Sequence, residues 1–352
     1  MYPTGKVTVP RLCVFFMIVQ TFVEQGTPFL SDESINRINS AQNSWKAGRN
    51  YDLNSEEKVM RLLNKLDAKN LDEADTLPVK TEDPAWPSDK KIPKTFDARK
   101  KWGKICPQIS EIQDQGNCGS SWALASSSAA TDRLCIRSKG KFQGSLSAQH
   151  IAFCSMRFGN GCDGGNSFYG WNLLKKSGVV TGGGFNSSKG CQPYSIQPCI
   201  NSIAYQKICK ACHWCIPKYF WMFYLKMISV LYYNLSLFTV KSIYFLQDGV
   251  KSMQKDIMTH GPITMSFQVY SDFFHYKSGV YKNTTSEYLG NLAVRALGWG
   301  EENGIPYWLI ANAWNPYWGD KGLFKVLRGS NACGIETEVL AGVPRKWKQI
   351  GE

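Results

Sequence analysis

A short stretch of the chain combines residue types suited to nucleophilic chemistry with a local structure that would activate them. Residues 115–123 read Gln-Gly-Asn-Cys-Gly-Ser-Ser-Trp-Ala, and apolar residues follow at helical spacing as far as Cys135. The start of such a helix presents unpaired backbone N–H groups and the positive end of the helix dipole. That environment stabilises a thiolate, so cysteine nucleophiles are often placed there. The sequence predicts a glycine-rich turn that leads into a helix at about Ser121.

This stretch resembles the active-site segment of papain-family cysteine peptidases, which reads Q-x-G-x-C-G-S-C-W. In that pattern the nucleophile is the cysteine directly before the tryptophan, and Ser121 stands at this position. Cys118 matches a structural cysteine that forms a disulfide. Gln115 matches the glutamine of the oxyanion hole, and the resemblance implies that its amide and the backbone N–H of Ser121 point at the same oxygen.

The resemblance also places the residue that orients the catalytic base, but not the base itself. Asn312-Ala313-Trp314 matches the family's N-S-W, which implies that Asn312 hydrogen-bonds the base and that Trp314 shields this bond. The family's G-G-H-A corresponds to Gly290-Asn291-Leu292-Ala293, so Leu292 stands at the histidine position. Leucine cannot accept a proton. No histidine of the chain matches this position; the four are His150, His213, His260 and His275.

Further motifs resemble cathepsin B in particular. Residues 43–51 resemble the T-T-W-x-A-G-x-N-F signature of cathepsin B propeptides, and residues 92–99 resemble the start of the mature enzyme. Residues 190–199 resemble the opening of the occluding loop. The His-His pair that captures a substrate C-terminus is missing from this loop, so the resemblance gives no support for release of dipeptides.

Positions that bind substrate in the family are better retained. Gly164 and Gly165 match glycines of the C-N-G-G turn that pair with the substrate backbone, and Trp314 belongs to the same cleft. Glu338 matches the acidic residue at the bottom of the cathepsin B S2 pocket, where it could pair with a basic side chain. The alternative for Glu338 is a solvated surface carboxylate.

The replacements at Ser121 and Leu292 together predict very slow peptide hydrolysis. A serine hydroxyl is a weak nucleophile at neutral pH unless a base removes its proton. A helix N-terminus contributes only about 0.3–1 kcal/mol at exposed sites, and general base catalysis is worth about 10²–10⁴-fold. We therefore expect an inactive pseudoprotease that retains a peptide-binding cleft. The alternative is an active cathepsin B-like endopeptidase, if these two positions are misreported or compensated.

The resemblance implies an α+β, papain-like two-domain fold with a helical left domain, a β-rich right domain and a cleft between them. Residues 92–352 would form this peptidase domain, and residues 27–91 an N-terminal helical propeptide. Within the propeptide, Ser31-Asp32-Glu33 predicts a helix start and residues 55–71 a charged helix. The alternative for residues 27–91 is a small helical subdomain. The expected partners are this propeptide and a peptide or protein ligand in the cleft.

The N-terminus predicts export from the cytosol. Residues 1–26 resemble a signal peptide, with Lys6 and Arg11 before an apolar run, Leu12–Val23, that is too short to span a membrane. No A-x-A pattern marks the cleavage site. We expect a secreted or lysosomal protein in an oxidising compartment. N-x-S/T sequons, which are candidate glycosylation sites, begin at Asn186, Asn234 and Asn283.

The cysteines predict a disulfide framework. Removal of residues 1–26 leaves eleven of the twelve cysteines, and an odd number predicts at least one unpaired thiol. The resemblance implies the pairs Cys106–Cys135, Cys118–Cys162 and Cys199–Cys209. It leaves Cys154 and Cys191 to pair with Cys212 and Cys215 in either order, and Cys333 unpaired. A zinc site is the alternative for the ligand-like spacing of Cys209, Cys212, His213 and Cys215, but we expect no metal and no cofactor.

The net charge of +13 and the pI of about 9.1 fit a basic globular protein. No Lys/Arg tract carries interleaved aromatic residues, so we expect no nucleic-acid partner. Residues 216–246 interrupt the resemblance with an apolar, aromatic-rich segment. Lys226 and Lys241 cut its apolar runs short of a membrane span, so we expect no stable span. The remaining interpretations are a buried insertion and an error in the gene model, such as a translated intron, which we favour.

Overall fold

The computed structural model describes residues 28–64, 76–154, 160–188, 190–198 and 237–346. The predicted signal peptide and most of the predicted insertion lie outside these ranges. The same holds for several residues named above, namely Cys199, Cys209, Cys212, His213, Cys215 and Asn234. None of the helices in the described ranges is long and apolar enough to cross a membrane.

Most of the helices precede the long strands along the chain, as in an α+β fold, and α8 lies between two strands. The helices are α1 (Asp32–Ala41), α2 (Glu56–Met60), α3 (Ala98–Trp102), α4 (Ser121–Arg137), α5 (Ala148–Cys154), α6 (Ser167–Lys176) and α8 (Val250–His260). The strands are β1 (Trp45–Ala47), β2 (Phe96–Asp97), β3 (Ser145–Leu146), β4 (Thr181–Gly182), β5 (Val240–Phe245), β6 (Ile263–Tyr270), β7 (Tyr276–Tyr281), β8 (Tyr288–Glu302), β9 (Ile305–Ala311), β10 (Leu323–Leu327) and β11 (Val339–Pro344).

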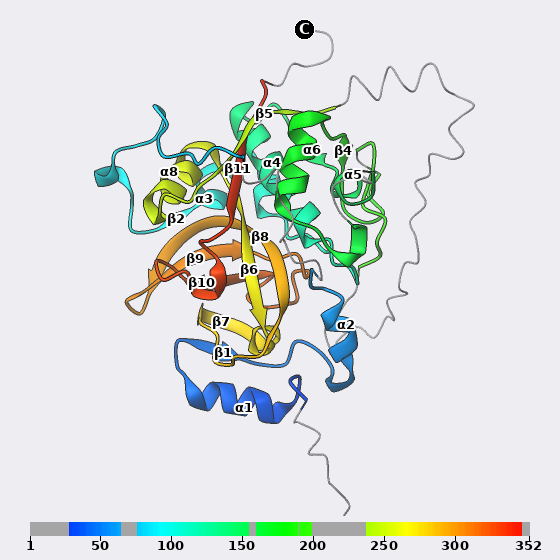
Figure 1. Cartoon of the computed structure of the whole chain (residues 1–352), viewed down its shortest axis with the longest axis vertical. Helices are drawn as coiled ribbons and strands as arrows, with labels where there is room; N and C mark the ends of the chain where they lie inside the picture. The colour runs from blue at the N-terminus through cyan, green and yellow to red at the C-terminus, as the bar shows by residue number, and fades with distance from the viewer. Residues whose placement is uncertain (1–27, 65–75, 155–159, 189, 199–236, 347–352) are drawn as a thin grey trace, which may run out of the picture.

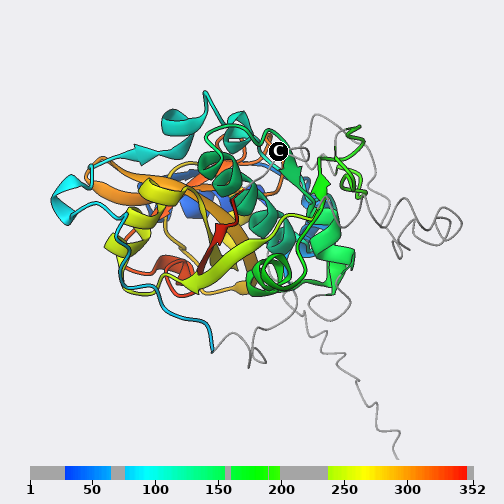
Figure 2. The ribbon, with the colours of Figure 1, turned by 90° about the horizontal axis from the view of Figure 1, so that it is seen from above.

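The main sheet has the order β1-β7-β10-β9-β8-β6-β11-β5, with β2 added beside β8. Helices α4, α5 and α6 lie beside the β-rich half of the molecule (Figure 1). Helix α4 packs on β8 of the sheet and on both α5 and α6, and α6 also packs on β5. One apolar cluster joins the buried residues of these helices to Ile243, Ala293 and Leu340 of the sheet. Seen from above, α4 runs through the middle of the molecule (Figure 2). Its first residue, Ser121, bonds to Ala293 on β8 and so lies where the helices meet the sheet.

The N-terminal unit packs against the β-rich half. Helix α1 begins where the sequence predicts, because the side chain of Ser31 accepts a hydrogen bond from the backbone N–H of Ser34. Strand β1 then extends the main sheet at β7, and the indole N–H of Trp45 donates to the carbonyl of Lys282 at 3.0 Å. Asn50 donates to two carbonyls of the same region, those of Phe274 and Tyr276. These contacts attach the N-terminal unit to the sheet, and Figure 1 shows α1 and β1 beside β7.

Two expectations about secondary structure need correction. The charged helix expected over residues 55–71 ends at Met60, and residues 65–71 lie outside the described ranges. The N–H groups of Arg61, Leu62 and Leu63 still bond to carbonyls three residues back, whereas Asn64 bonds to Asn291 and the carbonyl of Leu62 accepts from the side chain of Gln115. Residues 216–246 are predicted as one insertion, yet residues 240–245 form β5. This strand pairs with β11 and buries Ile243 and Tyr244, so the end of the apolar segment belongs to the folded domain.

Candidate active site

The first residue of α4 is Ser121, and the turn before it is held from several directions. The disulfide Cys118–Cys162 ties the turn to the loop that precedes α6. Gly119 lies so close to that loop that a Cβ atom there would stand 2.6 Å from the carbonyl oxygen of Cys162. Ser120 shares a hydrogen bond with the hydroxyl of Tyr194. The small residues of the motif are therefore required for the close packing that fixes Ser121.

The hydroxyl of Ser121 is buried and fully engaged. It accepts a hydrogen bond from the backbone N–H of Ala293 at 3.2 Å and donates one to Oδ1 of Asn64 at 3.3 Å. Ala293 belongs to β8, whereas Asn64 belongs to the segment predicted as the propeptide. An amide oxygen is not basic enough to remove the proton of an alcohol, so Ser121 has no general base in this arrangement.

The predicted oxyanion-hole residue binds a carbonyl of the N-terminal segment. Nε2 of Gln115 donates to the carbonyl oxygen of Leu62 at 2.8 Å and to that of Cys118. The Gln115 side chain is buried, and its Oε1 has no hydrogen-bond partner among the described residues. The amide is thus placed to polarise a carbonyl that lies beside Ser121.

Leu292 stands on β8 directly before Ala293 and is completely buried. Its side chain belongs to the same apolar cluster as Leu62 and Leu63 of the N-terminal segment. A hydrocarbon side chain therefore stands at the place where β8 approaches Ser121. This position can contribute to binding through apolar contact but cannot exchange a proton.

Asn312, the predicted orienting residue, is also buried beside this site. Its Oδ1 accepts from the N–H of Ala313 at 2.8 Å, while its Nδ2 has no partner within the described part of the chain. Trp314 stacks on Phe274 with the ring centroids 5.0 Å apart and meets Tyr51 edge-on. Trp314 is therefore held in an aromatic cluster, and the amide nitrogen of Asn312 contacts no base among the described residues.

The histidines of the described ranges are held away from Ser121. His150 lies on α5 and is buried, and this burial lowers its pKa to about 4. His260 is paired with Asp83, and His275 with the carbonyl of Phe29. None of these three contacts Ser121, so no described histidine takes the role that Leu292 cannot fill.

The predicted substrate-binding residues lie on both sides of α4. A Cβ on Gly165 would stand 2.5 Å from the ring of Trp122, so only glycine fits over this indole. Gly164 adopts a positive φ of 116°. Glu338 is half-buried and accepts a hydrogen bond from Nδ2 of Asn166 at 2.6 Å. Burial raises the pKa of Glu338, and the bond from Asn166 partly offsets this effect. Glu338 is therefore not a freely solvated carboxylate.

Residues 62–64 complete the site, although no site residue is predicted there from the sequence. The N–H of Asn64 donates to the carbonyl of Asn291 at 2.9 Å, and the two residues form an antiparallel bridge. Leu62 and Asn64 bind Gln115 and Ser121, as described above. Nothing in the local sequence marks these residues, because their partners lie more than fifty positions away along the chain.

A cavity of about 540 Å³ lies farther along α4 and is lined by Ser128, Asp132 and Arg295 among others. It does not include Ser121, Gln115 or Leu292. The space beside Ser121 is instead taken by residues 62–64 of the N-terminal segment.

The cysteines fit the expected framework where they are described, while glycosylation of the sequons stays a prediction. The disulfides Cys106–Cys135 and Cys118–Cys162 are formed, and Cys333 is a buried free thiol. Cys154 and Cys191 form no disulfide with another described residue, and their expected partners, Cys212 and Cys215, lie outside the described ranges, so that pairing stays a prediction. The described residues hold no His/Cys/Asp/Glu cluster suited to a metal. The candidate glycosylation sites differ in exposure: Asn186 is exposed, whereas Asn283 is half-buried with its Nδ2 bound to the carbonyl of Thr285.

Comparison with known proteins agrees with this geometry. Residues 92–343 match the family described as papain family cysteine protease, and residues 30–63 match the peptidase family C1 propeptide. Two relatives from Caenorhabditis elegans, cathepsin B-like cysteine proteinases 4 and 5, are each 39% identical to 88% of this chain. These matches cover 90% and 89% of the relatives' own lengths.

Solved proenzyme structures share the fold. Procathepsin B S9 from Trypanosoma congolense superposes with a TM-score of 0.72 at 31% identity and covers 91% of this chain and 100% of its own. A digestive procathepsin L2 from Tenebrio molitor superposes with a TM-score of 0.64 at 24% identity, covering 88% and 89%. The chain belongs to the papain family of cysteine proteases, as a cathepsin B-like homologue whose C1 propeptide is part of the same polypeptide.

Proposed function

We propose that this protein is a secreted or lysosomal pseudoprotease that binds peptides in its cleft without cleaving them. The observation that carries the proposal is the environment of the Ser121 hydroxyl. Its proton points to the amide oxygen of Asn64, and the adjoining position on β8 is Leu292. Neither group accepts a proton at physiological pH, so the alcohol stays a weak nucleophile.

The parts of the cleft that hold a peptide support a binding role. Gln115 engages the carbonyl of Leu62, and Asn64 pairs with Asn291 as a short antiparallel bridge. These contacts need no ionisation of Ser121. The propeptide is therefore the resident ligand of the cleft, and other peptides would bind once it has been displaced.

Glu338 predicts which side chain the cleft prefers at the P2 position of a peptide. In sequence it corresponds to the acidic S2 residue of cathepsin B, and its carboxylate accepts a hydrogen bond from Asn166. A basic side chain at P2 would pair with it in a half-buried site, where such a charge pair is screened less than on the surface.

The proposal is tested by measuring whether a peptide binds to the protein and whether it is cleaved. A fluorescent peptide with Arg at P2 is titrated into protein from which residues 1–91 have been removed by an added protease. The peptide is then recovered and analysed by mass spectrometry. We expect saturable binding, intact peptide, and a loss of the preference for Arg over Leu at P2 in Glu338→Gln. Absence of binding by a folded processed protein, or recovery of cleaved peptide, would contradict the proposal.

A further inference from the structure

The segment that joins the propeptide to the peptidase domain is docked on the domain as an extended strand. The carbonyl of Pro78 accepts from the N–H of Phe245 at 3.0 Å, and the N–H of Lys80 donates to the carbonyl of Phe245 at 2.9 Å. Phe245 is the last residue of β5, which forms the edge of the main sheet. The joining segment thus extends this sheet by a short parallel pairing, a mode by which sheets often bind peptides.

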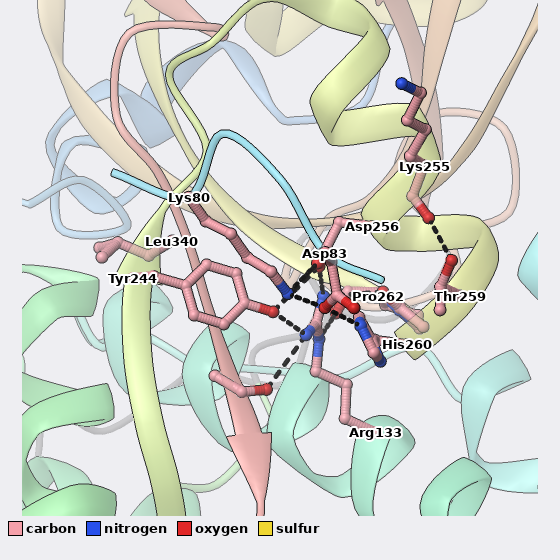
Figure 3. Close-up of polar contacts among 12 residues, drawn as sticks. Lys80, Asp83, Arg133, Tyr244, Lys255, Asp256, Thr259, His260, Pro262 and Leu340 are labelled. Carbon is pink, nitrogen blue, oxygen red and sulfur yellow. Dashed lines mark hydrogen bonds and ion pairs between the residues drawn. The ribbon is translucent and has the colours of Figure 1, made fainter. Parts of the chain in front are cut away.

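Lys80 is the centre of this contact. Its Nζ lies 4.4 Å from the ring centroid of Tyr244 and 3.4 Å from Oδ1 of Asp256, as Figure 3 shows. Asp256 is completely buried on α8, and it also holds Arg133 and the hydroxyl of Tyr244. A cation that lies over an aromatic ring and reaches a buried carboxylate gains both cation–π and charge-pair stabilisation.

Two further side chains follow at intervals of three residues. Asp83 pairs with His260 at 2.9 Å and with Lys80, and the indole N–H of Trp86 lies 3.3 Å from Oδ1 of Asp256. The side chains of Lys80, Asp83 and Trp86 are partly buried, whereas Thr81, Glu82, Pro84 and Ala85 between them are exposed. The side chains that contact the domain therefore follow the pattern Lys-x-x-Asp-x-x-Trp. We call the surface formed by Tyr244, Phe245, Asp256 and His260 the linker site.

We propose that the linker site is a second peptide-binding site, separate from the cleft, that takes an extended segment with the pattern Lys-x-x-Asp-x-x-aromatic. Residues 78–86 are its resident occupant. Cleavage at the predicted processing boundary after residue 91 would release this occupant and make the site available to a partner with the same chemistry. The site uses neither Ser121 nor Leu292, so the inference does not depend on loss of catalysis.

The test uses the full chain with its own occupant displaced. The double variant Lys80→Glu/Asp83→Lys keeps the net charge but sets a carboxylate against Asp256 and an ammonium against His260. Hydrogen exchange at the amides of Lys80 and Phe245 reports whether the segment has left. A labelled peptide of residues 76–91 is then titrated into this variant and into the parent chain, and its fluorescence anisotropy is followed.

We expect faster hydrogen exchange in the variant than in the parent, and saturable binding of the peptide to the variant. The parent should bind the peptide at least tenfold more weakly, because its own residues 78–86 occupy the linker site. A peptide that carries Lys80→Met should bind the variant at least tenfold more weakly than the native peptide. Unchanged exchange in the variant would overturn the proposal, because Lys80 and Asp83 would then not hold the segment. Equal affinity of the two peptides, or no binding to a variant whose segment has left, would overturn it as well.

Discussion

The hydroxyl of Ser121 donates its hydrogen bond to Oδ1 of Asn64, a residue of the segment predicted as the propeptide, at 3.3 Å. The family places its nucleophile at the position of Ser121, and here that side chain instead joins the two parts of the proprotein. The same oxygen accepts a bond from Ala293 on β8, so both its donor and its acceptor capacity are used in binding.

This arrangement predicts a structural role for the hydroxyl. Ser121→Ala removes it and leaves the N–H of Ala293 and the side chain of Asn64 without their partner in a buried site. Such a loss costs about 1–3 kcal/mol, so the free energy of unfolding of the full chain should fall by this amount in urea denaturation. Ser128→Ala, on the same helix at the wall of the cavity, is the control and should stay within about 0.5 kcal/mol of the parent. Equal effects would show that the hydroxyl of Ser121 is not needed.

The buried ion pair between Arg133 and Asp256 predicts a larger effect on stability. Both side chains are fully buried, and Arg133 also donates to the carbonyls of Pro262 and Gly342. Arg133→Met leaves the carboxylate of Asp256 without its main partner, and breaking such a pair costs about 3–5 kcal/mol. The measurement is guanidinium denaturation beside Arg137→Met, an exposed arginine at the end of the same helix. A cost for Arg133→Met no larger than for Arg137→Met would refute this assignment.

Asp114 predicts a dependence of stability on pH. Burial raises its pKa from 3.8 to about 6, against a smaller opposing effect of the bond from the N–H of Gly116. The folded state therefore binds this proton more tightly than the unfolded state does. The contribution is fully present below about pH 4 and is lost as the pH rises through 6.

Asp114→Asn removes this titration, so its free energy of unfolding should change less than that of the parent between pH 4 and pH 7. Part of the parent's slope should remain, because burial also raises the pKa of Asp132 to about 6. Urea denaturation at pH 4, 5, 6 and 7 measures both slopes. Parallel curves for the two proteins would contradict the role given to Asp114.

Local signals were sufficient to predict much of the fold. Ser31 predicts the start of α1, and the glycine-rich turn predicts the start of α4 at Ser121. The family resemblance led to the pairs Cys106–Cys135 and Cys118–Cys162. These features depend on neighbouring residues or on a motif, which a sequence displays directly.

Features that depend on distant contacts could not be predicted. The backbone of Leu62 and Asn64 bonds to Gln115 and Asn291, which no local pattern announces. The sequence alone could not assign the apolar residues of β5 to the folded domain, because β11, the strand that pairs with them, lies about a hundred residues later. The docking of Lys80 on Asp256 is hidden from the sequence for the same reason.

The central claim is that the loss of two side chains, and not the loss of the cleft, prevents catalysis. The direct measurement is hydrolysis of a fluorogenic peptide with Arg at P2 by four proteins processed by the same added protease: the parent, Ser121→Cys, Leu292→His and the double variant. Nucleophile and base act as a unit, so each single variant should remain far below the double variant. We predict turnover by the double variant and none above background by the parent. Turnover by the parent at a rate comparable to the double variant would contradict the account.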